Sequence, residues 1–314
     1  MDELSLLKVP FFFMIDFTMK QVEIYQENEI LESGLNVDFQ KFKKVESWLD
    51  TSGDFHLNAF PESQEHYEKG FRNVQQHLRL GNSYLVNYTR ETPIEINADL
   101  KEIFHRSKAK YKLLYKDEFV CFSPETFVEI VDNKIFTHPM KGTIDASVPN
   151  AMEVLKNDKK EKAEHYTVVD LLRNDLSMVA DGVRVDEFQR MDFIKTQQKS
   201  LYAMSSEISG DLKPEFQGKI GSIMRTLLPA GSILGAPKPK TMEIILESEG
   251  YERGWYTGVC GWFDGKNLDS CVMIRFIEQR DGAFFFKSGG GITHLSCLED
   301  EYQEMKNKIY VPIY

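Results

Sequence analysis

The sequence has few cysteines, and none of them belongs to a closely spaced pair. Cys121, Cys260, Cys271 and Cys297 stand singly in a chain of 314 residues. A zinc site or a redox dithiol usually shows a CxxC spacing, so the sequence predicts neither. Few cysteines in a long chain are also typical of a reducing compartment.

The sequence also lacks an excess of positive charge and a long apolar run. Asp and Glu number 49 against 38 Lys and Arg, which gives a net charge of −11. A nucleic-acid surface needs a basic stripe to neutralise phosphates, so we expect no nucleic-acid partner. The longest early apolar run, 9–17, contains Asp16 and is too short to span a bilayer. We therefore expect a strand there, no membrane segment and a cytoplasmic protein.

Periodicity predicts both helices and short strands. Helical spacing predicts helices that include 67–78, 159–177, 237–249 and 299–310, with Gly81 and Gly250 as stop signals for two of them. Alternating runs predict strands over 84–89, 119–123, 127–131, 135–137, 259–263, 268–276 and 283–288, with turns at 132–134, 264–265 and 281–282. Because short turns join most strands, the pattern favours an α+β protein with antiparallel sheets.

Two ionisable side chains stand beside predicted strands. Glu125 lies in the SPETF stretch between two of them, and a carboxylate at a strand end can be a general acid if burial raises its pKa. Lys141 precedes Gly142 and is a candidate nucleophile if its ammonium form is disfavoured. An exposed turn glutamate and a solvated loop lysine are the ordinary alternatives.

Three helical glutamates form a candidate metal site. Glu164 lies on the predicted helix 159–177, and Glu301 and Glu304 share one face of the last helix because they are three residues apart. Mg²⁺ prefers a few carboxylates and several waters, so such a set suits it. Solvated surface glutamates are the alternative.

Two glycine-bearing segments are candidate anion sites. The stretch 229–238 (PAGSILGAPK) opens a predicted helix, where main-chain N–H groups, the helix dipole and Lys238 could attract an anion. After the strand 283–288, the run Gly289–Gly291 would let a ligand carboxylate approach the main chain. Structural turns are the alternative for both segments.

In this order, the motifs resemble the chorismate-utilising enzyme family. That family includes aminodeoxychorismate synthase component I, anthranilate synthase component I, and the isochorismate and salicylate synthases. The resemblance runs from about residue 65 to 312, and LLRND, GAPK, GGGI and EYQE in series are its most specific part. Its carriers are GNSYLVNYT (81–89), SPETF (123–127), MKGT (140–143), KAEHYTVVDLLRNDL (162–176), PAGSILGAPK (229–238), YTGVCGW (256–262), VMIRF (272–276), SGGGI (288–292) and EDEYQEMKNK (299–308).

The resemblance implies a fold and a domain organisation. The chorismate-binding enzyme fold has large antiparallel sheets with helices packed outside. At roughly 150 residues per domain, the length alone suggests about two domains or one large one. The spread of the motifs favours one large domain, in which 1–64 is a shortened N-terminal region and 65–314 is the catalytic part.

Within the family, Lys141 implies the aminodeoxychorismate synthase activity. The motif is P-I-K-G-T in that branch and P-I-A-G-T in anthranilate and isochorismate synthases. In the implied reaction the lysine adds to C2 of chorismate as the C4 hydroxyl leaves, and ammonia then enters at C4 and releases the lysine. The product, 4-amino-4-deoxychorismate, keeps its pyruvate and leads to 4-aminobenzoate and folate.

The resemblance also implies roles for the other candidate residues. Glu125 matches the acid that protonates the departing hydroxyl. Cationic side chains and main-chain donors would offset the two carboxylates of chorismate as these leave water. The positions that match substrate-binding residues are Tyr256, Lys238, Arg275, Gly289, Gly290 and Gly291, and those that match Mg²⁺ ligands are Glu164 and Glu304, with Glu301 beside them.

The sequence departs from the family pattern at several positions. Leu85 replaces the Gln or Lys of the G-D-x-x-K stretch, Ala203 replaces the histidine of H-L-x-S, and Leu234 replaces a hydroxyl residue. The arginines expected in 144–147 and at Met178 are also absent. The histidine is linked to pyruvate elimination in anthranilate synthases, so its loss argues against that activity. Two alternatives stay open: an anthranilate synthase and a non-catalytic chorismate-binding subunit.

The source of ammonia is a further expectation. The sequence contains no G-x-C-x-G motif, which marks the nucleophile of glutaminases. The resemblance therefore implies that the chain uses free ammonia or a separate glutamine amidotransferase subunit.

Overall fold

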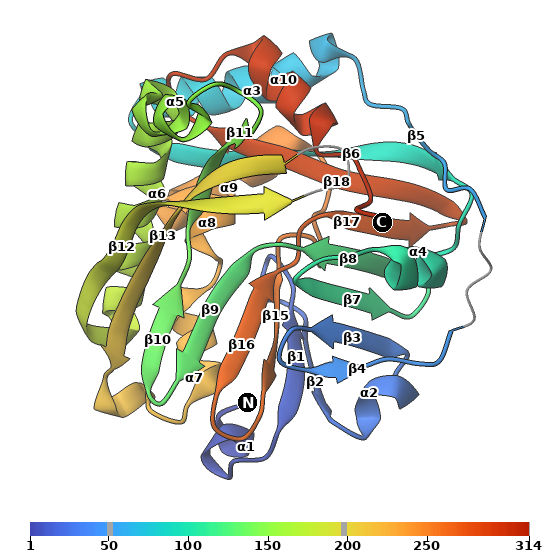
Figure 1. Cartoon of the computed structure of the whole chain (residues 1–314), viewed down its shortest axis with the longest axis vertical. Helices are drawn as coiled ribbons and strands as arrows, with labels where there is room; N and C mark the ends of the chain where they lie inside the picture. Colours follow the sequence, from blue (N-terminus) through green and yellow to red (C-terminus); the bar gives the residue numbers. More distant parts are fainter. Residues whose placement is uncertain (49–52, 196–199, 314) are drawn as a thin grey trace. The chain divides into compact units, whose positions relative to one another are not determined.

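A computed structural model describes residues 1–48, 53–195 and 200–313 (Figure 1). These residues form two nine-stranded antiparallel sheets with helices, so the predicted α+β class is confirmed. The chain divides into two compact units. Unit 1 contains 1–10, 126–232 and 263–270, and unit 2 contains 11–125, 233–262 and 271–314. The assignment of 1–64 and 65–314 as parts of one domain stays a prediction.

Unit 1 consists of a curved set of strands and the helices that pack on it. The strands β11, β13, β10 and β9 are neighbours in that order, and β12 pairs with β13. Helix α6 packs against β11, β12 and β13, and it buries Val168, Leu172 and Leu176. The elements are α1 (Asp2–Leu6), β9 (Thr126–Val131), β10 (Lys134–Thr137), β11 (Met140–Asp145), α5 (Ala151–Asn157), α6 (Lys159–Val179), β12 (Ala180–Lys195), β13 (Ser200–Leu212), η1 (Pro214–Phe216) and α7 (Ile220–Leu227).

Unit 2 contains a complete sheet and its covering helices. The sheet has the order β14-β6-β18-β17-β8-β7-β3-β4, and β5 pairs with β6. Its elements are β1 (Phe11–Ile15), β2 (Val22–Gln26), α2 (Glu29–Glu32), β3 (Leu35–Phe39), β4 (Lys43–Lys44), β5 (Leu57–Ala59), α3 (Gln64–Arg79), β6 (Leu85–Ile96), α4 (Leu100–Arg106), β7 (Tyr111–Tyr115), β8 (Phe119–Ser123), β14 (Gly235–Ala236), α9 (Lys238–Glu249), β17 (Phe276–Arg280), β18 (Ala283–Ile292) and α10 (Leu298–Asn307). At the sequence boundaries of the units lie α8 (Gly231–Leu234), β15 (Val259–Phe263) and β16 (Leu268–Val272).

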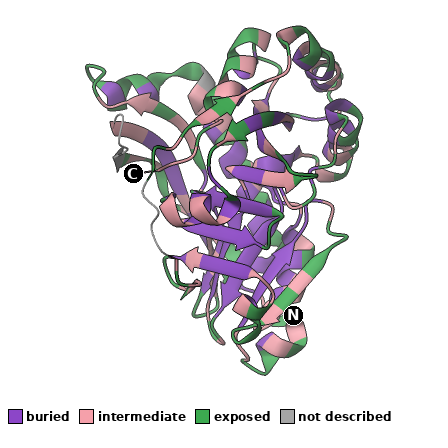
Figure 2. Cartoon of the chain, turned by 90° about the vertical axis from the view of Figure 1, so that its right-hand side faces the viewer, coloured by how far each residue is buried: buried purple, intermediate pink, exposed green. Residues whose placement is uncertain are grey.

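The sheet of unit 2 is buried on both faces. Along β8, Phe119 and Cys121 face one apolar cluster, whereas Val120 and Phe122 face another. Alternate residues of a strand point to opposite faces, so a strand with two buried faces is apolar throughout. Figure 2 shows this burial as purple strands. Tyr256 belongs to the first cluster, so the core of this unit holds one of the candidate site residues.

Local signals predict several elements and turns well. Asp132 and Asn133 both have positive φ, of 49° and 60°, in the tight turn between β9 and β10. Two central residues with positive φ are typical of hairpin turns, and Asn and Asp tolerate that conformation. Helix α9 ends at Gly250, whose φ of 67° is the left-handed conformation common at a helix C-terminus.

Two sequence predictions are wrong at the C-terminal strands. The run 268–276 forms two strands, β16 and β17, separated by 273–275, and Arg275 has a φ of 53° there. The change of sheet requires this break, because β16 and β17 belong to different sheets. The strand β18 continues to Ile292, so Gly289–Gly291 lie inside a strand and the turn alternative for them is wrong.

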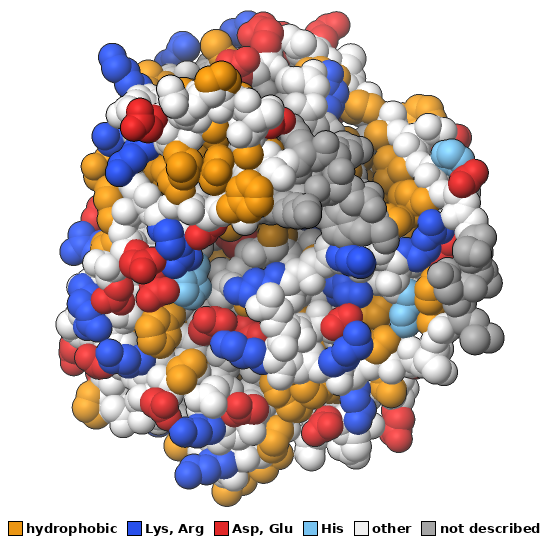
Figure 3. Space-filling model, viewed as in Figure 1, with side chains coloured by type: hydrophobic (Ala, Val, Ile, Leu, Met, Phe, Trp, Pro, Cys, Tyr) orange, Lys and Arg blue, Asp and Glu red, His pale blue; other side chains and the backbone are white. Residues whose placement is uncertain are grey.

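Charged side chains of both signs are interspersed on the face shown in Figure 3. The described residues form surface ion pairs, such as Arg190 with Glu187 and Lys266 with Asp132. Exposed pairs of this kind contribute little to stability. Within the described part of the chain, no helix has both the length and the apolar character needed to cross a bilayer.

Candidate active site

Unit 2 brings Glu125, Tyr256 and Arg275 together. Tyr256 is buried, and burial is the main reason why the pKa of its hydroxyl is raised. The charges of Arg275 and Glu125 both act on this hydroxyl, the first lowering and the second raising its pKa. A candidate acid, a neutral hydroxyl donor and a guanidinium therefore share one electrostatic environment.

Main-chain hydrogen bonds hold Glu125 and Arg275 in place. The N–H of Phe122 donates to the carbonyl oxygen of Arg275 at 3.1 Å, and the N–H of Val272 donates to that of Glu125 at 3.1 Å. The N–H of Glu125 donates to Ser123 Oγ at 3.1 Å. Arg275 Nε is buried and has no hydrogen-bond partner among the described residues. A guanidinium with an unused buried donor suits a carboxylate ligand.

The glycine run of β18 lies against β6. Gly289, Gly290 and Gly291 pair with Thr89, Tyr88 and Asn87. A Cβ atom on Gly289 would lie 2.2 Å from the carbonyl oxygen of Tyr88. No side chain fits so close to main chain, so this position requires glycine for the approach of the two strands.

Two of the three candidate metal ligands meet at this glycine run. A Cβ atom on Gly290 would lie 3.1 Å from Glu304 Oε1 and 3.3 Å from Glu301 Oε2. Glu301 is only 2% exposed, and both carboxylates contribute, after burial, to the raised pKa of Tyr67. Lys308 Nζ bonds to Glu304 Oε1 at 2.6 Å and to the carbonyl oxygen of Gly289 at 2.7 Å.

This carboxylate pair fits part of a magnesium site. Mg²⁺ binds through one or two carboxylates and keeps several waters, so two converging carboxylates are a sufficient protein contribution. Among the described residues, no group of three or more His, Cys, Asp or Glu side chains is gathered around one point. The third candidate, Glu164, belongs to unit 1 and lies partly buried on α6.

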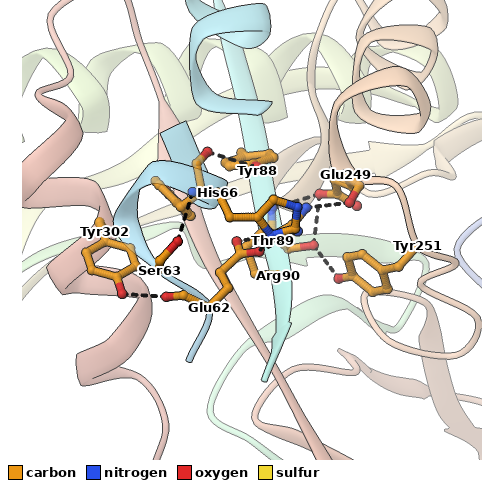
Figure 4. Close-up of polar contacts among 10 residues, drawn as sticks. Glu62, Ser63, His66, Tyr88, Thr89, Arg90, Glu249, Tyr251 and Tyr302 are labelled. Atoms are coloured by element: carbon orange, nitrogen blue, oxygen red, sulfur yellow. Dashed lines mark hydrogen bonds and ion pairs between the residues drawn. The ribbon is translucent and has the colours of Figure 1, made fainter. Parts of the chain in front are cut away.

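A buried polar network fixes β6 behind the glycine run (Figure 4). Glu249 Oε1 accepts from Thr89 N at 2.7 Å and from Thr89 Oγ1 at 2.8 Å. The same carboxylate binds Arg253 Nε at 2.8 Å and Nη2 at 2.6 Å, and both side chains are 1% exposed. Arg253 Nη2 also donates to Asn87 O at 2.6 Å. The network thus anchors the two β6 residues that pair with Gly289 and Gly291.

The charge balance of this network favours the ionised pair. Burial alone would lower the pKa of Arg253, but the Glu249 charge and hydrogen bonds offset burial and raise it. Arg90 extends the network to Glu62 with bonds of 2.5 and 2.7 Å, and Tyr302 of α10 donates to Glu62 O at 2.6 Å. Helices α9 and α10 are therefore tied to the same strand.

Unit 1 supplies Lys141 from a bulge in β11. Lys141 pairs with Met204 of β13, and the register then shifts between Lys141 and Thr143. Gly142, at the shift, has a φ of 75°, and a Cβ atom there would lie 2.8 Å from Glu161 Oε2 on α6. Bulges re-aim side chains, and this one sets the direction of the candidate nucleophile against α6.

His165 is a buried residue near Lys141 that the sequence motifs do not single out. It follows Glu164 on α6, and its side chain is 0% exposed. Burial first and the charge of Lys141 second lower its pKa to about 4, so the ring is neutral at pH 7. Its proximity to Lys141 depends on the packing of α6 on β11, which periodicity cannot reveal.

Lys238 and the three residues that depart from the family pattern lie in partly or fully buried positions. Lys238 is the first residue of α9 and is partly buried. Leu85, Leu234 and Ala203 are 3%, 0% and 0% exposed. Leu85 pairs with Ala236, and Ala203 pairs with Thr143 beside the bulge. These apolar side chains therefore serve the packing of the strands that carry the candidate residues.

The comparisons with known proteins agree with these motifs. A family model for chorismate binding enzymes matches residues 20–313. An uncharacterised PabA-like protein of Pasteurella multocida is 51% identical over 97% of this chain and 94% of its own length. Aminodeoxychorismate synthase component 1 of Escherichia coli is 30% identical over 94% of this chain and 66% of that protein. Anthranilate synthase component 1 of Saccharomyces cerevisiae is 30% identical over 78% of this chain and 51% of that protein.

A solved structure shares the fold. The menaquinone-specific isochorismate synthase of Escherichia coli is 16% identical and superposes with a TM-score of 0.74. The match covers 98% of this chain and 78% of that chain. At this identity the similarity concerns the fold alone.

The buried pair yields a stability prediction. Arg253→Met should lower the free energy of unfolding by about 3–5 kcal/mol, because the Glu249 charge stays buried without its partner. Adding Glu249→Gln should recover part of this loss, since the amide oxygen can still accept from Thr89. Urea denaturation measures both. The exposed pair of Glu68 and Arg72 is the control, and Arg72→Met should cost less than about 1 kcal/mol. Equal losses for the buried and exposed variants would contradict the anchoring role.

Proposed function

The chain belongs to the chorismate-binding enzyme family, and from this premise we propose that it is an aminodeoxychorismate synthase. The observation that carries the proposal is Lys141, placed by a bulge of β11 against α6. By the family resemblance, anthranilate and isochorismate synthases have alanine there. The 30% identity with the aminodeoxychorismate synthase component 1 of Escherichia coli supports the same assignment.

The proposed reaction proceeds in two displacements. The neutral amine of Lys141 forms a bond to C2 of chorismate, the two ring double bonds each shift by one position toward C4, and the C4–O bond breaks. Glu125 gives a proton to the departing hydroxyl, which leaves as water. Ammonia then forms a bond to C4, the two ring double bonds shift back, and the bond between C2 and Lys141 breaks. The proton that the bound ammonia loses returns to Glu125. The sum is chorismate and ammonia to 4-amino-4-deoxychorismate and water, with the enolpyruvyl group retained.

Binding of the dianionic substrate is assigned to donors of unit 2. Arg275 offers its unused Nε–H, and Tyr256, whose raised pKa keeps it protonated, offers a hydroxyl donor. Gly289–Gly291 have no side chain that would keep a ligand carboxylate away from the main chain of β18. Lys238 adds a positive charge at the start of α9.

We also propose Mg²⁺ as the cofactor, with Glu301 and Glu304 as its ligands in unit 2 and Glu164 as the further ligand that the family resemblance implies. The convergence of Glu301 and Glu304 on Gly290 supports the first two ligands, and the family resemblance supports the third. When bound, the ion would neutralise a substrate carboxylate. This role explains why a chain of net charge −11 would bind a dianion.

The proposed source of ammonia is a separate glutamine amidotransferase. The 314 residues contain no G-x-C-x-G motif. Cys121, Cys260 and Cys271 are buried in the strands of unit 2 and its boundary, which does not suit a glutaminase nucleophile.

Product identification tests the assignment directly. The protein is incubated with chorismate, Mg²⁺ and ammonium, and products are separated by chromatography and identified by mass. We expect 4-amino-4-deoxychorismate without pyruvate release. Anthranilate with pyruvate would instead establish the activity of the yeast relative, and chorismate binding without turnover would establish a non-catalytic subunit.

The nucleophile assignment predicts the effect of Lys141→Ala. Amination should be nearly abolished, because a methyl group cannot form the covalent intermediate. Lys134→Ala, which removes a lysine from β10, separated from β11 by β13 in the same sheet, is the matched control and should leave turnover close to wild type. Rates are measured at saturating chorismate and ammonium, and unchanged turnover of Lys141→Ala would refute the nucleophile role.

The metal assignment predicts the effect of Glu304→Gln. Removing a charged ligand should raise the Mg²⁺ concentration needed for half-maximal activity by roughly 10-fold or more. Glu299→Gln changes an exposed carboxylate in the first turn of the same helix and serves as the control. If both titration midpoints stay at the wild-type value, the metal site lies elsewhere.

A further inference from the structure

Among the described residues, hydrogen bonds hold the His165 ring through one of its two nitrogens. Its Nε2 lies 2.7 Å from Ser206 Oγ, and Ser206 Oγ also accepts from Gln189 N at 3.1 Å. The ring of Phe188 packs against the imidazole, with centroids 5.7 Å apart. These contacts fix the plane of a fully buried imidazole within unit 1.

The other ring nitrogen has an unused hydrogen-bonding capacity. Nδ1 of His165 is buried and has no hydrogen-bond partner among the described residues. Buried polar atoms are nearly always paired, so a fully enclosed one calls for a functional explanation. Packing alone would be served by an apolar side chain of similar size.

The sheet register places Lys141 on the same face as this imidazole. Lys141 is paired with Met204, and directly paired residues of an antiparallel sheet project to the same face. Ser206 is two residues from Met204 on β13, so it projects to that face as well. Helix α6 packs on β11, and a Cβ atom on Gly142, next to Lys141, would lie 2.8 Å from Glu161 Oε2, one helical turn before His165.

We propose that His165 is a positioning residue for Lys141. Its Nδ1 accepts a hydrogen bond from the lysine amine, and this bond directs the lone pair of the amine toward the substrate. This inference rests on the proposed function, in which Lys141 is the nucleophile. The tautomer follows from the partners: a lysine amine beside the ring offers N–H donors, so Nδ1 carries the lone pair and Nε2–H donates to Ser206. His165 takes part in no bond making or breaking.

The experiment compares two amide substitutions that mimic different ring nitrogens. In His165→Asn the short amide places its oxygen near the position of Nδ1, whereas in His165→Gln the longer amide reaches the position of Nε2. Tyr166→Phe, at the neighbouring half-exposed residue of α6, is the matched control. Thermal melts followed by circular dichroism establish that each variant is folded.

The first readout is the steady-state kinetics of amination. His165→Gln should lose roughly 10-fold or more in kcat, because misaligned reactants react slowly, with little change in KM for chorismate. His165→Asn should recover most of kcat, and Tyr166→Phe should resemble wild type. Equal losses in the Asn and Gln variants would show that the ring only fills space and would overturn the proposal.

The second readout is independent of turnover. Acetylation of Lys141 by an N-hydroxysuccinimide ester is followed by peptide mass spectrometry and normalised to Lys134 in the same unit. The normalised rate should differ from wild type in His165→Gln and return toward it in His165→Asn. An unchanged rate in every variant would overturn the proposal even if amination were observed. If the acetylation rate of Lys141 responds to these substitutions but the protein makes no 4-amino-4-deoxychorismate, the proposed function is wrong and the pairing of His165 with Lys141 stands.

A second variant covers the case in which His165→Gln does not fold. Ser206→Ala keeps the imidazole but removes the partner of Nε2. The ring then loses its fixed plane, so kcat and the normalised acetylation rate should both move in the direction of His165→Gln. Wild-type values for both quantities in a folded Ser206→Ala protein would also overturn the proposal.

Discussion

The close pairing of β6 with β18 is the constraint on which the candidate site of unit 2 depends. The strands approach so closely at Gly289 that a Cβ atom would meet the Tyr88 carbonyl at 2.2 Å. Behind them, the buried pair of Glu249 and Arg253 holds Thr89 and Asn87 through main-chain contacts. On the other side, Glu301 and Glu304 of α10 converge on Gly290. The buried pair of Glu249 and Arg253, the glycine run of β18 and the two carboxylates of α10 therefore form one assembly.

In unit 1, a bulge in β11 determines the position of the candidate nucleophile, Lys141. A bulge at Gly142 changes the register of β11 beside Lys141, and α6 covers the same face of the strands. His165 of that helix is neutral because burial and the Lys141 charge both disfavour the imidazolium. A neutral ring can accept a hydrogen bond from an amine at one nitrogen, whereas both nitrogens of an imidazolium are donors. The unit thus combines a strand irregularity with a buried polar side chain.

The departures from the family pattern acquire a physical meaning in the structure. Leu85 and Leu234 are buried apolar residues, and Leu85 pairs with Ala236 in the short contact between β6 and β14. Ala203 sits opposite Thr143, directly beside the bulge of β11. Each replaces a polar family residue with a side chain that only packs. The polar chemistry proposed for this chain is therefore concentrated on Lys141, Glu125 and the donors of unit 2.

By itself, the sequence determined the helices with strong periodicity, the hairpin turn at Asp132 and Asn133, the end of α9 at Gly250 and the order of the motifs, because these depend on neighbouring residues. Only the tertiary structure decided that 268–276 breaks at Arg275 and that the glycine run lies within β18, because strand pairing and sheet membership join distant segments. The partners of Glu249 and the unpaired Nδ1 of His165 were equally beyond local pattern. Hydrogen bonds across roughly 40 and 160 residues leave no periodic signal in the chain.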